Sequence, residues 1–178
     1  MGLDVFISME FSYEPYAMLD QPWHCAKCGA ELELIKSQPC HCFGCDQKAY
    51  LDPKLVAACI VSIGRKILLV RRAIEPGLGR WSFPSGYVNR GEKVELAAQR
   101  EVLEETDLEV EIKFLVGLYS TSGHPVVLAV YDAKIIGGDM KAGEETLDVG
   151  MFDIGHLPEM AFEHDEKIIG DWYSKLPD

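Results

Sequence analysis

Three glutamates near the middle of the chain, Glu101, Glu104 and Glu105, have a spacing that suits a metal site. The run from Lys93 to Glu105 is rich in Glu, Leu, Ala, Gln and Arg and has no Gly or Pro, so it predicts a helix. On a helix, positions i, i+3 and i+4 share one face within an arc of roughly 100°. Three carboxylates so placed repel one another unless a cation lies between them, and hard divalent ions prefer oxygen ligands. The pattern indicates a divalent-metal site, with a solvated acidic helix face as the plainer alternative.

The residues around the glutamates extend this pattern. Gly86 is followed six positions later by Glu92, and after seven more residues by the run REVLEE at 100–105. This arrangement resembles the Nudix box, the signature of the Nudix hydrolases. It departs from that signature at Asp107, where the family has its second glycine. Aspartate is among the few other residues that tolerate the left-handed conformation ending a helix, so we expect the turn to be kept.

The resemblance implies a set of Mg2+ or Mn2+ ligands shared between the loop and the helix. These are the backbone carbonyl near Gly86 and the carboxylates of Glu101, Glu104 and Glu105. It also implies that Glu92 and Arg100 pair as a structural bridge that holds the loop against the helix.

The implied reaction is hydrolysis of a nucleoside diphosphate linked to another group, at the diphosphate. The metals would neutralise the diphosphate and activate a water. The general base is left open between a box glutamate and a later loop glutamate, which here means Glu144 or Glu145.

Four cysteines form two CxxC pairs, Cys25, Cys28, Cys42 and Cys45. Two such pairs suit a tetrahedral Zn2+, and four thiolates leave no open position, so the site is expected to be structural. A disulfide or redox pair is the alternative. Cys40 competes with Cys42, as do His24 and His41 more weakly, and the CxxC spacing favours Cys42. The sixth cysteine, Cys59, lies in an apolar run and is predicted to be a buried core thiol.

From Lys54 onward the pattern changes to β. Residues 55–63 and 67–72 predict a hairpin covered on both faces, and 109–119 and 126–136 predict further strands. Val110, Ile112, Phe114 and Val116 are expected on one face of their strand, and Leu96 and Leu103 on the buried side of the helix. A closing amphipathic helix has Phe162, Ile169 and either Trp172 or Tyr173 as candidate core residues.

The fold class implied by the resemblance is α/β: a Nudix α/β/α sandwich with a mixed sheet, preceded by a small N-terminal zinc ribbon. The expected domains are an arm at 1–20, the ribbon at 21–50 and the Nudix domain at 51–178. Outer motifs resemble the zinc-ribbon branch of the family: a Tyr-x-x-Pro-Lys link, a Trp-x-x-Pro-x-Gly segment before the box, and a later Leu-Pro then Ala-Phe. That branch includes hydrolases of ADP-ribose, FAD and NADH.

Candidate substrate contacts flank the box. Arg71 and Arg72 end a strand and are candidates for phosphate or ribose contact, with plain surface charges as the alternative. Four aromatic residues are candidates to stack on a base, with an ordinary core role as the alternative: Trp81, Phe83, Tyr119 and Phe162. The expected substrate is ADP-ribose or a nucleotide sugar, then FAD or NADH. The rival function is a non-catalytic Nudix module that senses a nucleotide and uses the ribbon for partner contact.

The amino-acid composition limits the classes of molecule that this protein is expected to bind. The net charge is −12 and the pI is near 4.8, which disfavours broad electrostatic binding to nucleic acid. The sequence has neither a signal-peptide pattern nor an apolar run long enough to span a membrane. We therefore expect a small-molecule nucleotide substrate, a cytoplasmic location and no membrane partner. A homodimer formed through the ribbon is a further hypothesis.

Overall fold

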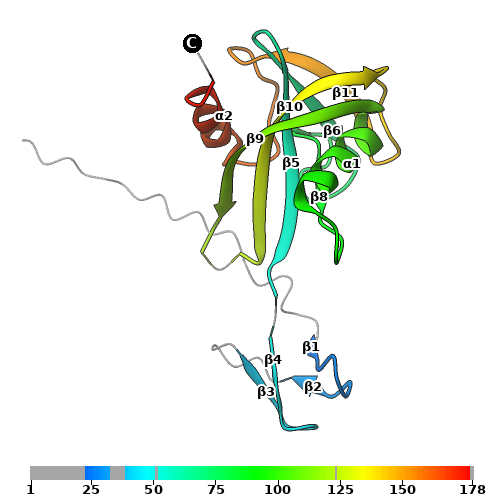
Figure 1. Ribbon diagram of the computed structural model, residues 1–178, viewed down its shortest axis with the longest axis vertical. Helices are drawn as coiled ribbons and strands as arrows, with labels where there is room; N and C mark the ends of the chain where they lie inside the picture. Colours follow the sequence, from blue (N-terminus) through cyan, green and yellow to red (C-terminus); the bar gives the residue numbers. More distant parts are fainter. Residues whose placement is uncertain (1–22, 33–38, 51, 123, 177–178) are drawn as a thin grey trace, which may run out of the picture. The chain divides into compact units, whose positions relative to one another are not determined.

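The computed structural model describes residues 23–32, 39–50, 52–122 and 124–176. The chain divides into two compact units, of which one ends at Asp52 and the other comprises Pro53–Ser122 and Val126–Asp178 (Figure 1). The arm expected at 1–20 lies outside the described residues. Within the described part of the chain, neither helix is long and apolar enough to cross a membrane.

The first unit consists of two short antiparallel pairs of strands. β1 (Trp23–His24) pairs with β2 (Glu31–Leu32), and β3 (Cys40–Cys42) pairs with β4 (Gln47–Ala49). Each CxxC pair lies at a turn that joins two of these strands. A Cβ at Gly44 would come 2.7 Å from the Ala30 Cβ, so only glycine lets the second turn pack against the first.

The second unit is built on a mixed sheet in the order β11-β6-β5-β10-β9. β5 and β10 are parallel, whereas the other neighbours in this path are antiparallel. Its strands are β5 (Lys54–Ile63), β6 (Lys66–Arg72), β9 (Leu108–Ser120), β10 (Val126–Gly138) and β11 (Thr146–Asp153). Two short strands join the sheet from the side: β7 (Trp81–Ser82) pairs with β6, and β8 (Ser85–Tyr87) pairs with β5.

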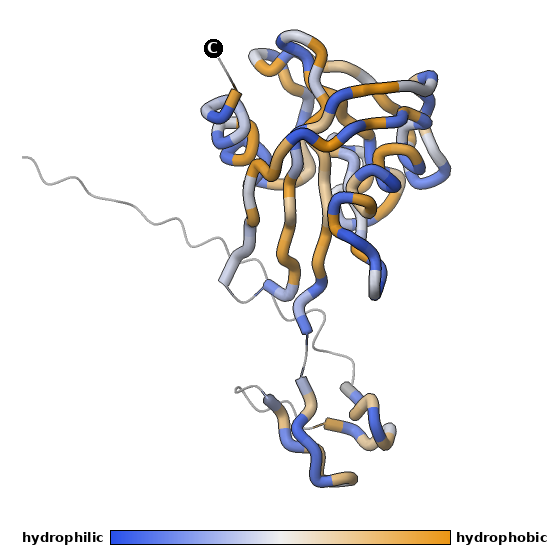
Figure 2. Tube along the Cα trace, viewed as in Figure 1, coloured by the Kyte–Doolittle hydropathy of each residue, from blue (hydrophilic) through white to orange (hydrophobic). Residues whose placement is uncertain are grey.

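One helix covers each face of this sheet. α1 (Val94–Thr106) belongs to one apolar cluster and α2 (Asp165–Tyr173) to the other. β5 alternates between the two clusters, since Cys59 faces the first and Ile60 the second, and both are 0% exposed. The apolar centre of the sheet is visible in Figure 2. The predicted α/β/α sandwich, the 55–72 hairpin and the buried Cys59 are therefore confirmed.

The prediction that Leu96 and Leu103 face the sheet was wrong. They are 53% and 45% exposed, whereas Ala97, Ala98 and Val102 are fully buried. These small residues let α1 approach the sheet closely. The helix is therefore turned about half a revolution from the expected position, and this rotation brings its acidic side toward β8.

One further local prediction needs correction. Val110 and Ile112 pack in the α1 cluster, but Phe114 packs in the α2 cluster, because register shifts against β10 interrupt the alternation of β9. In α2 the buried residues are Asp165, Ile168 and Trp172. Of the predicted core residues, Trp172 is therefore confirmed, Ile169 is half-buried against the core, and Tyr173 is exposed. The strand β11 was not predicted from the sequence.

A buried hydrogen bond fixes α2 to the sheet. The indole Nε1 of Trp172 donates to Asp132 Oδ1 at 2.7 Å, and both residues are buried. We predict that Trp172→Phe lowers the free energy of unfolding by about 1–3 kcal/mol, because it leaves the carboxylate of Asp132 without this donor. Denaturant unfolding measures the effect, and Tyr173→Phe on the same helix is the control, since Tyr173 is exposed. Equal midpoints for the two variants would contradict the prediction.

Candidate active site

Two of the three box glutamates lie against the backbone of β8. A Cβ at Gly86 would come within 2.2 Å of the Glu101 carboxylate, so the glycine leaves the space that this carboxylate occupies. The backbone N–H of Ser85 donates to Glu105 Oε2 at 3.0 Å. α1 and β8 therefore hold both carboxylates at the start of the box.

Burial makes these two carboxylates difficult to ionise together. It raises the pKa of Glu105 to about 8, against the lowering effect of the Ser85 N–H, and the neighbouring charge of Glu101 raises it further. Burial also raises the pKa of Glu101, although the hydrogen bond from Arg100 opposes this shift. A divalent cation would favour the ionised form of both, and an all-oxygen donor set suits a hard cation such as Mg2+. The residues present thus fit such a cation.

Arg100 ties the loop to the helix. Its Nε and Nη2 donate to the two oxygens of Glu92 at 2.9 and 3.0 Å, and Nη2 also donates to the carbonyl of Tyr87. This bidentate contact, with the Asn89 N–H, lowers the pKa of Glu92 to about 2. Nη1 of Arg100 binds Glu101 at 2.6 Å and Glu104 at 3.0 Å.

Glu104 differs from the other two box glutamates. Its side chain is 57% exposed and that of Glu101 is 13% exposed. Glu104 is thus the most exposed of the three box glutamates. The Arg100 guanidinium forms an ion pair with both Glu104 and Glu101.

The helix ends as expected at Asp107. This residue is left-handed, with φ 57° and ψ 19°, and its N–H donates to the carbonyl of Leu103 at 2.9 Å. Aspartate therefore serves in the position where the box pattern has glycine, and this prediction is confirmed.

The segment after β10 caps the same helix end. The N–H of Lys141 donates to the Thr106 carbonyl at 2.9 Å, and the N–H of Gly143 to the Glu105 carbonyl at 3.0 Å. The N–H of Ala73 donates to the carbonyl of Glu145 at 3.1 Å. Ala73 therefore fixes the backbone of Glu145, and the other two contacts fix the segment that precedes it.

The two loop glutamates lie in different places. The charge of Glu145 acts to raise the pKa of both Glu101 and Glu105, so it lies within electrostatic reach of these carboxylates. Glu144 instead lines a hollow of about 370 Å³ with Glu104 and Lys141. The sequence alone did not indicate which of these two glutamates lies closer to the box carboxylates, because both belong to the same loop.

The two arginines that end β6 also diverge. Nε of Arg71 donates to the Gly79 carbonyl at 2.8 Å, whereas Nε of Arg72 donates to the Pro76 carbonyl at 2.6 Å. The Arg72 guanidinium lies over the ring of Phe162, 5.3 Å from its centroid, and its charge acts to lower the pKa of Glu105. Of this pair, Arg72 is the one whose charge acts on Glu105.

The four candidate aromatics are scattered. Phe83 is 3% exposed in the core, so the prediction that it contacts a base was wrong. Trp81 packs edge-on against Phe152, and the Tyr119 hydroxyl donates to Asp171 at 3.0 Å, which ties it to α2.

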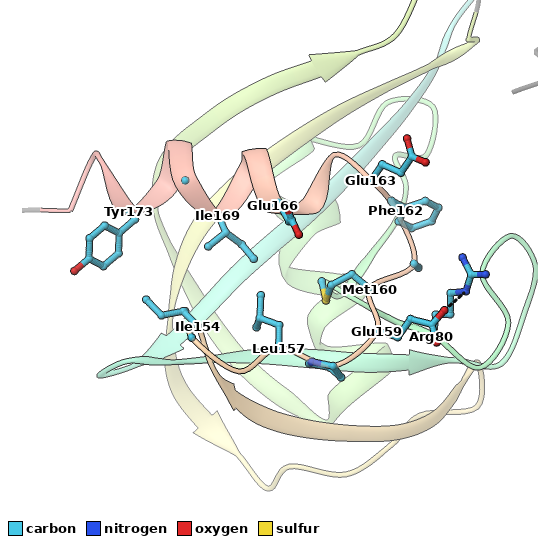
Figure 3. Close-up of a pocket in the computed structure, with 14 residues that line it drawn as sticks. Arg80, Ile154, Leu157, Glu159, Met160, Phe162, Glu163, Glu166, Ile169 and Tyr173 are labelled. Atoms are coloured by element: carbon cyan, nitrogen blue, oxygen red, sulfur yellow. Dashed lines mark ion pairs between the residues drawn. The ribbon is translucent and has the colours of Figure 1, made fainter. Parts of the chain in front are cut away.

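Phe162 has a different setting from the other three aromatics. It lines a hollow of about 850 Å³ where Ile154, Leu157 and Ile169 converge (Figure 3). The guanidinium of Arg72 lies over its ring, so Phe162 is the candidate aromatic that contacts one of the two candidate arginines.

The four cysteines of the first unit form one cluster. Their sulfur atoms lie within 4.8 Å of one another, with 3.7 Å between Cys25 and Cys45 and 3.6 Å between Cys28 and Cys42. Cys40 is buried but is not part of this group. The backbone N–H groups of Lys27 and Cys28 lower the pKa of the Cys25 thiol to about 6, which favours the thiolate that binds metal. The cluster could hold a metal ion.

The contact between Gly86 and Glu101 leads to a prediction. We expect Gly86→Ala to lower kcat by about a hundredfold, because the new methyl group displaces a carboxylate from its place in the site. Gly64→Ala is the control, since a Cβ there meets nothing within 4 Å. Because the φ of Gly64 is +59°, alanine at this position affects stability, so the stability of both variants is measured. Steady-state kinetics with circular dichroism separate lost activity from lost fold. An active Gly86 variant would show that this contact does not matter.

The comparisons with known proteins agree with the geometry. The NUDIX domain model matches residues 53–172. The chain is 40% identical over 130 residues to the ADP-ribose pyrophosphatase of Methanocaldococcus jannaschii, covering 70% of this chain and 76% of that protein. It is 29% identical to the NAD-capped RNA hydrolase NudC of Pectobacterium atrosepticum, covering 76% of this chain but 53% of NudC. A NUDIX hydrolase structure from Nitrosomonas europaea, 30% identical, superposes with a TM-score of 0.75 over 86% of this chain and 94% of that one.

Proposed function

Because this chain belongs to the Nudix hydrolase family, we propose that it hydrolyses the diphosphate bond of ADP-ribose, with NAD-like dinucleotides as second substrates. The observation that carries the proposal is the pair of half-buried carboxylates, Glu101 and Glu105, held against the backbone of Ser85 and Gly86. The 40% identity to an ADP-ribose pyrophosphatase supports the choice of substrate.

A divalent cation, Mg2+ or Mn2+, is part of the proposal. Glu101, Glu104 and Glu105, with the backbone near Gly86, would hold it. When bound it would neutralise the diphosphate and lower the pKa of a water. Arg100 holds the end of β8 and, through Glu92, the loop that follows it against α1, so the role of this pair is to position the ligands.

Glu145 is the proposed general base. Its backbone is fixed by Ala73, and its charge acts on both Glu101 and Glu105, whereas Glu144 lies beside Glu104. Glu145 would take a proton from the attacking water, whose oxygen bonds to one phosphorus while the bridging oxygen leaves with the other. With ADP-ribose this adds one water and gives AMP and ribose 5-phosphate.

The cysteine cluster is proposed to bind a structural Zn2+. Four thiolates complete a tetrahedral shell, so the ion would stabilise the first unit and take no part in hydrolysis.

A substrate panel tests the proposed activity. Purified protein is incubated with Mg2+ or Mn2+ and ADP-ribose, a nucleotide sugar, FAD, NADH or NAD-capped RNA, and the products are identified by chromatography. We expect AMP from ADP-ribose to appear fastest, and no hydrolysis once the divalent ion is chelated. Nucleotide binding without turnover under several metals would favour the sensor instead. Faster cleavage of the capped RNA would overturn both the order of substrates and the expectation of no nucleic acid.

A further inference from the structure

The helix α2 has a second apolar side that the rest of its unit leaves partly uncovered. Ile168 and Trp172 bury one side against the sheet, but Ile169 is half-buried and Tyr173 is 61% exposed. Both of the latter line the hollow of about 850 Å³. A surface helix of a monomer ordinarily has one apolar side, so the second side of α2 indicates a surface that a partner covers.

Gly170 lies in the middle of this second side. Glycine inside a helix is destabilising relative to alanine, because it loses more backbone freedom on folding. A Cβ at this position would meet nothing within 4 Å in the described part of the chain, so packing inside the molecule does not require glycine here. The missing side chain instead leaves a depression on the outside of α2, where a second helix can approach closely.

Four residues form a stripe along the outer side of α2. Glu166, Ile169, Gly170 and Tyr173 stand at i, i+3, i+4 and i+7, which places them on one face of the helix. All four line the hollow. Figure 3 shows the three of them that carry a long side chain on the side of α2 that faces the segment 154–160.

The order of these residues makes the stripe self-complementary. We consider two copies of α2 packed antiparallel about a two-fold axis that passes midway between Ile169 and Gly170. Each Ile169 then lies opposite Gly170 of the other copy, and its side chain fills the depression as a knob fills a hole. Each Tyr173 lies opposite Glu166 of the other copy, which places a hydroxyl donor against a carboxylate acceptor.

We infer that two copies of this chain associate through α2, with Ile169 of each copy packed on Gly170 of the other. An isologous contact requires one patch to match itself, and this stripe meets that requirement. The substrate is a poor occupant of the hollow, because the carboxylates of Glu163 and Glu166 on its lining repel a diphosphate. A single helix pair gives a small interface, so we expect a dissociation constant on the order of micromolar.

Sedimentation velocity of the full chain over a concentration series tests the inference. We expect a reversible equilibrium between monomer and dimer. Gly170→Ala should raise the dissociation constant of the dimer at least about tenfold, because a methyl group enters two symmetric contacts. The same variant should raise the melting temperature of the dilute, monomeric protein by about 2–4 °C, because alanine is the better helix former. A purely local role of Gly170 would change the melting temperature and leave association unchanged.

A size swap tests the pairing of Ile169 with Gly170. Gly170→Leu should abolish the dimer. Adding Ile169→Ala should restore the dissociation constant to within about tenfold of the original, because the large and small residues exchange places across the axis. Lys167→Leu is the matched control: it puts the same side chain on the same helix but outside the lining of the hollow, and it should leave association unchanged. Circular dichroism shows whether each variant is folded.

Three results would overturn the inference. The first is a chain that stays monomeric at every concentration. The second is a dimer that Gly170→Leu leaves intact, because association would then use the first unit or another surface. The third is a folded double variant that Ile169→Ala does not restore, since the two residues would then not face each other. None of these measurements requires hydrolysis, so they remain valid if the proposed function fails.

Discussion

Glu105→Gln abolishes hydrolysis while the fold is kept: kcat falls by about a thousandfold or more. The substitution removes one of the two carboxylates that face the proposed metal, and losing one electrostatic contact to a transition state costs about 100- to 1,000-fold by itself. The amide still has an oxygen that accepts the N–H of Ser85, so the contact between α1 and β8 is retained. Release of AMP from ADP-ribose under saturating Mg2+ measures the loss.

The same variant has a predicted effect on stability that depends on pH. The pKa of Glu105 in the folded, metal-free protein is about 8, above its ordinary value of 4.5. A raised pKa gives a contribution to stability that is complete below about pH 4.5 and is lost as the pH rises through 8. The Gln side chain does not titrate. The variant should therefore become more stable than the original protein as the pH rises from 4.5 to 8, and this difference in the free energy of unfolding should persist above pH 8.

Thermal unfolding of chelated protein at pH 5, 7 and 9 measures this difference. Glu95→Gln is the control, because Glu95 lies on the same helix and is exposed. It should retain activity and show no such dependence on pH. If Glu105→Gln remains active, the carboxylate pair is not the reaction centre.

The second large effect concerns the cysteine cluster. Cys42→Ser should weaken zinc binding by about a hundredfold, so that a competing chelator removes the ion from the variant before it removes it from the original protein. Structural zinc sites contribute about 10–16 kcal/mol in isolated modules, and one of four thiolates accounts for about 3 kcal/mol of this. The first unit has a small apolar cluster, made chiefly of Cys25, Leu32 and Cys42. It should therefore lose its fold without the ion. The sheet of the second unit has its own core and should be retained.

Cys40→Ser is the matched control, since Cys40 lies two residues earlier on the same strand and is outside the cluster. It should bind one zinc per chain. Elemental analysis of the purified proteins gives the metal content, and limited proteolysis shows whether cleavage is confined to residues 1–52. Zinc loss in Cys40→Ser with retention in Cys42→Ser would mean that Cys40 is the ligand.

The sequence by itself determined the features that depend on residues close together along the chain. The Nudix box, the two CxxC pairs and the helix ending at Asp107 are local patterns, and their chemistry depends on residues that are near one another along the chain. The hairpin of 55–72 and its burial on both faces also followed from the sequence, because an unbroken apolar run leaves no face for water.

The tertiary structure decided how these pieces are turned toward one another. Helical periodicity fixes the angle between Leu96 and Glu105, but not which of them faces the sheet; the small side chains of Ala97 and Ala98 and the space at Gly86 decide that. Likewise Glu144 was placed beside Glu104, and Arg72 over the ring of Phe162, only by packing between distant segments. Such packing depends on the shapes of both segments that come into contact, whereas a sequence pattern describes only one segment at a time.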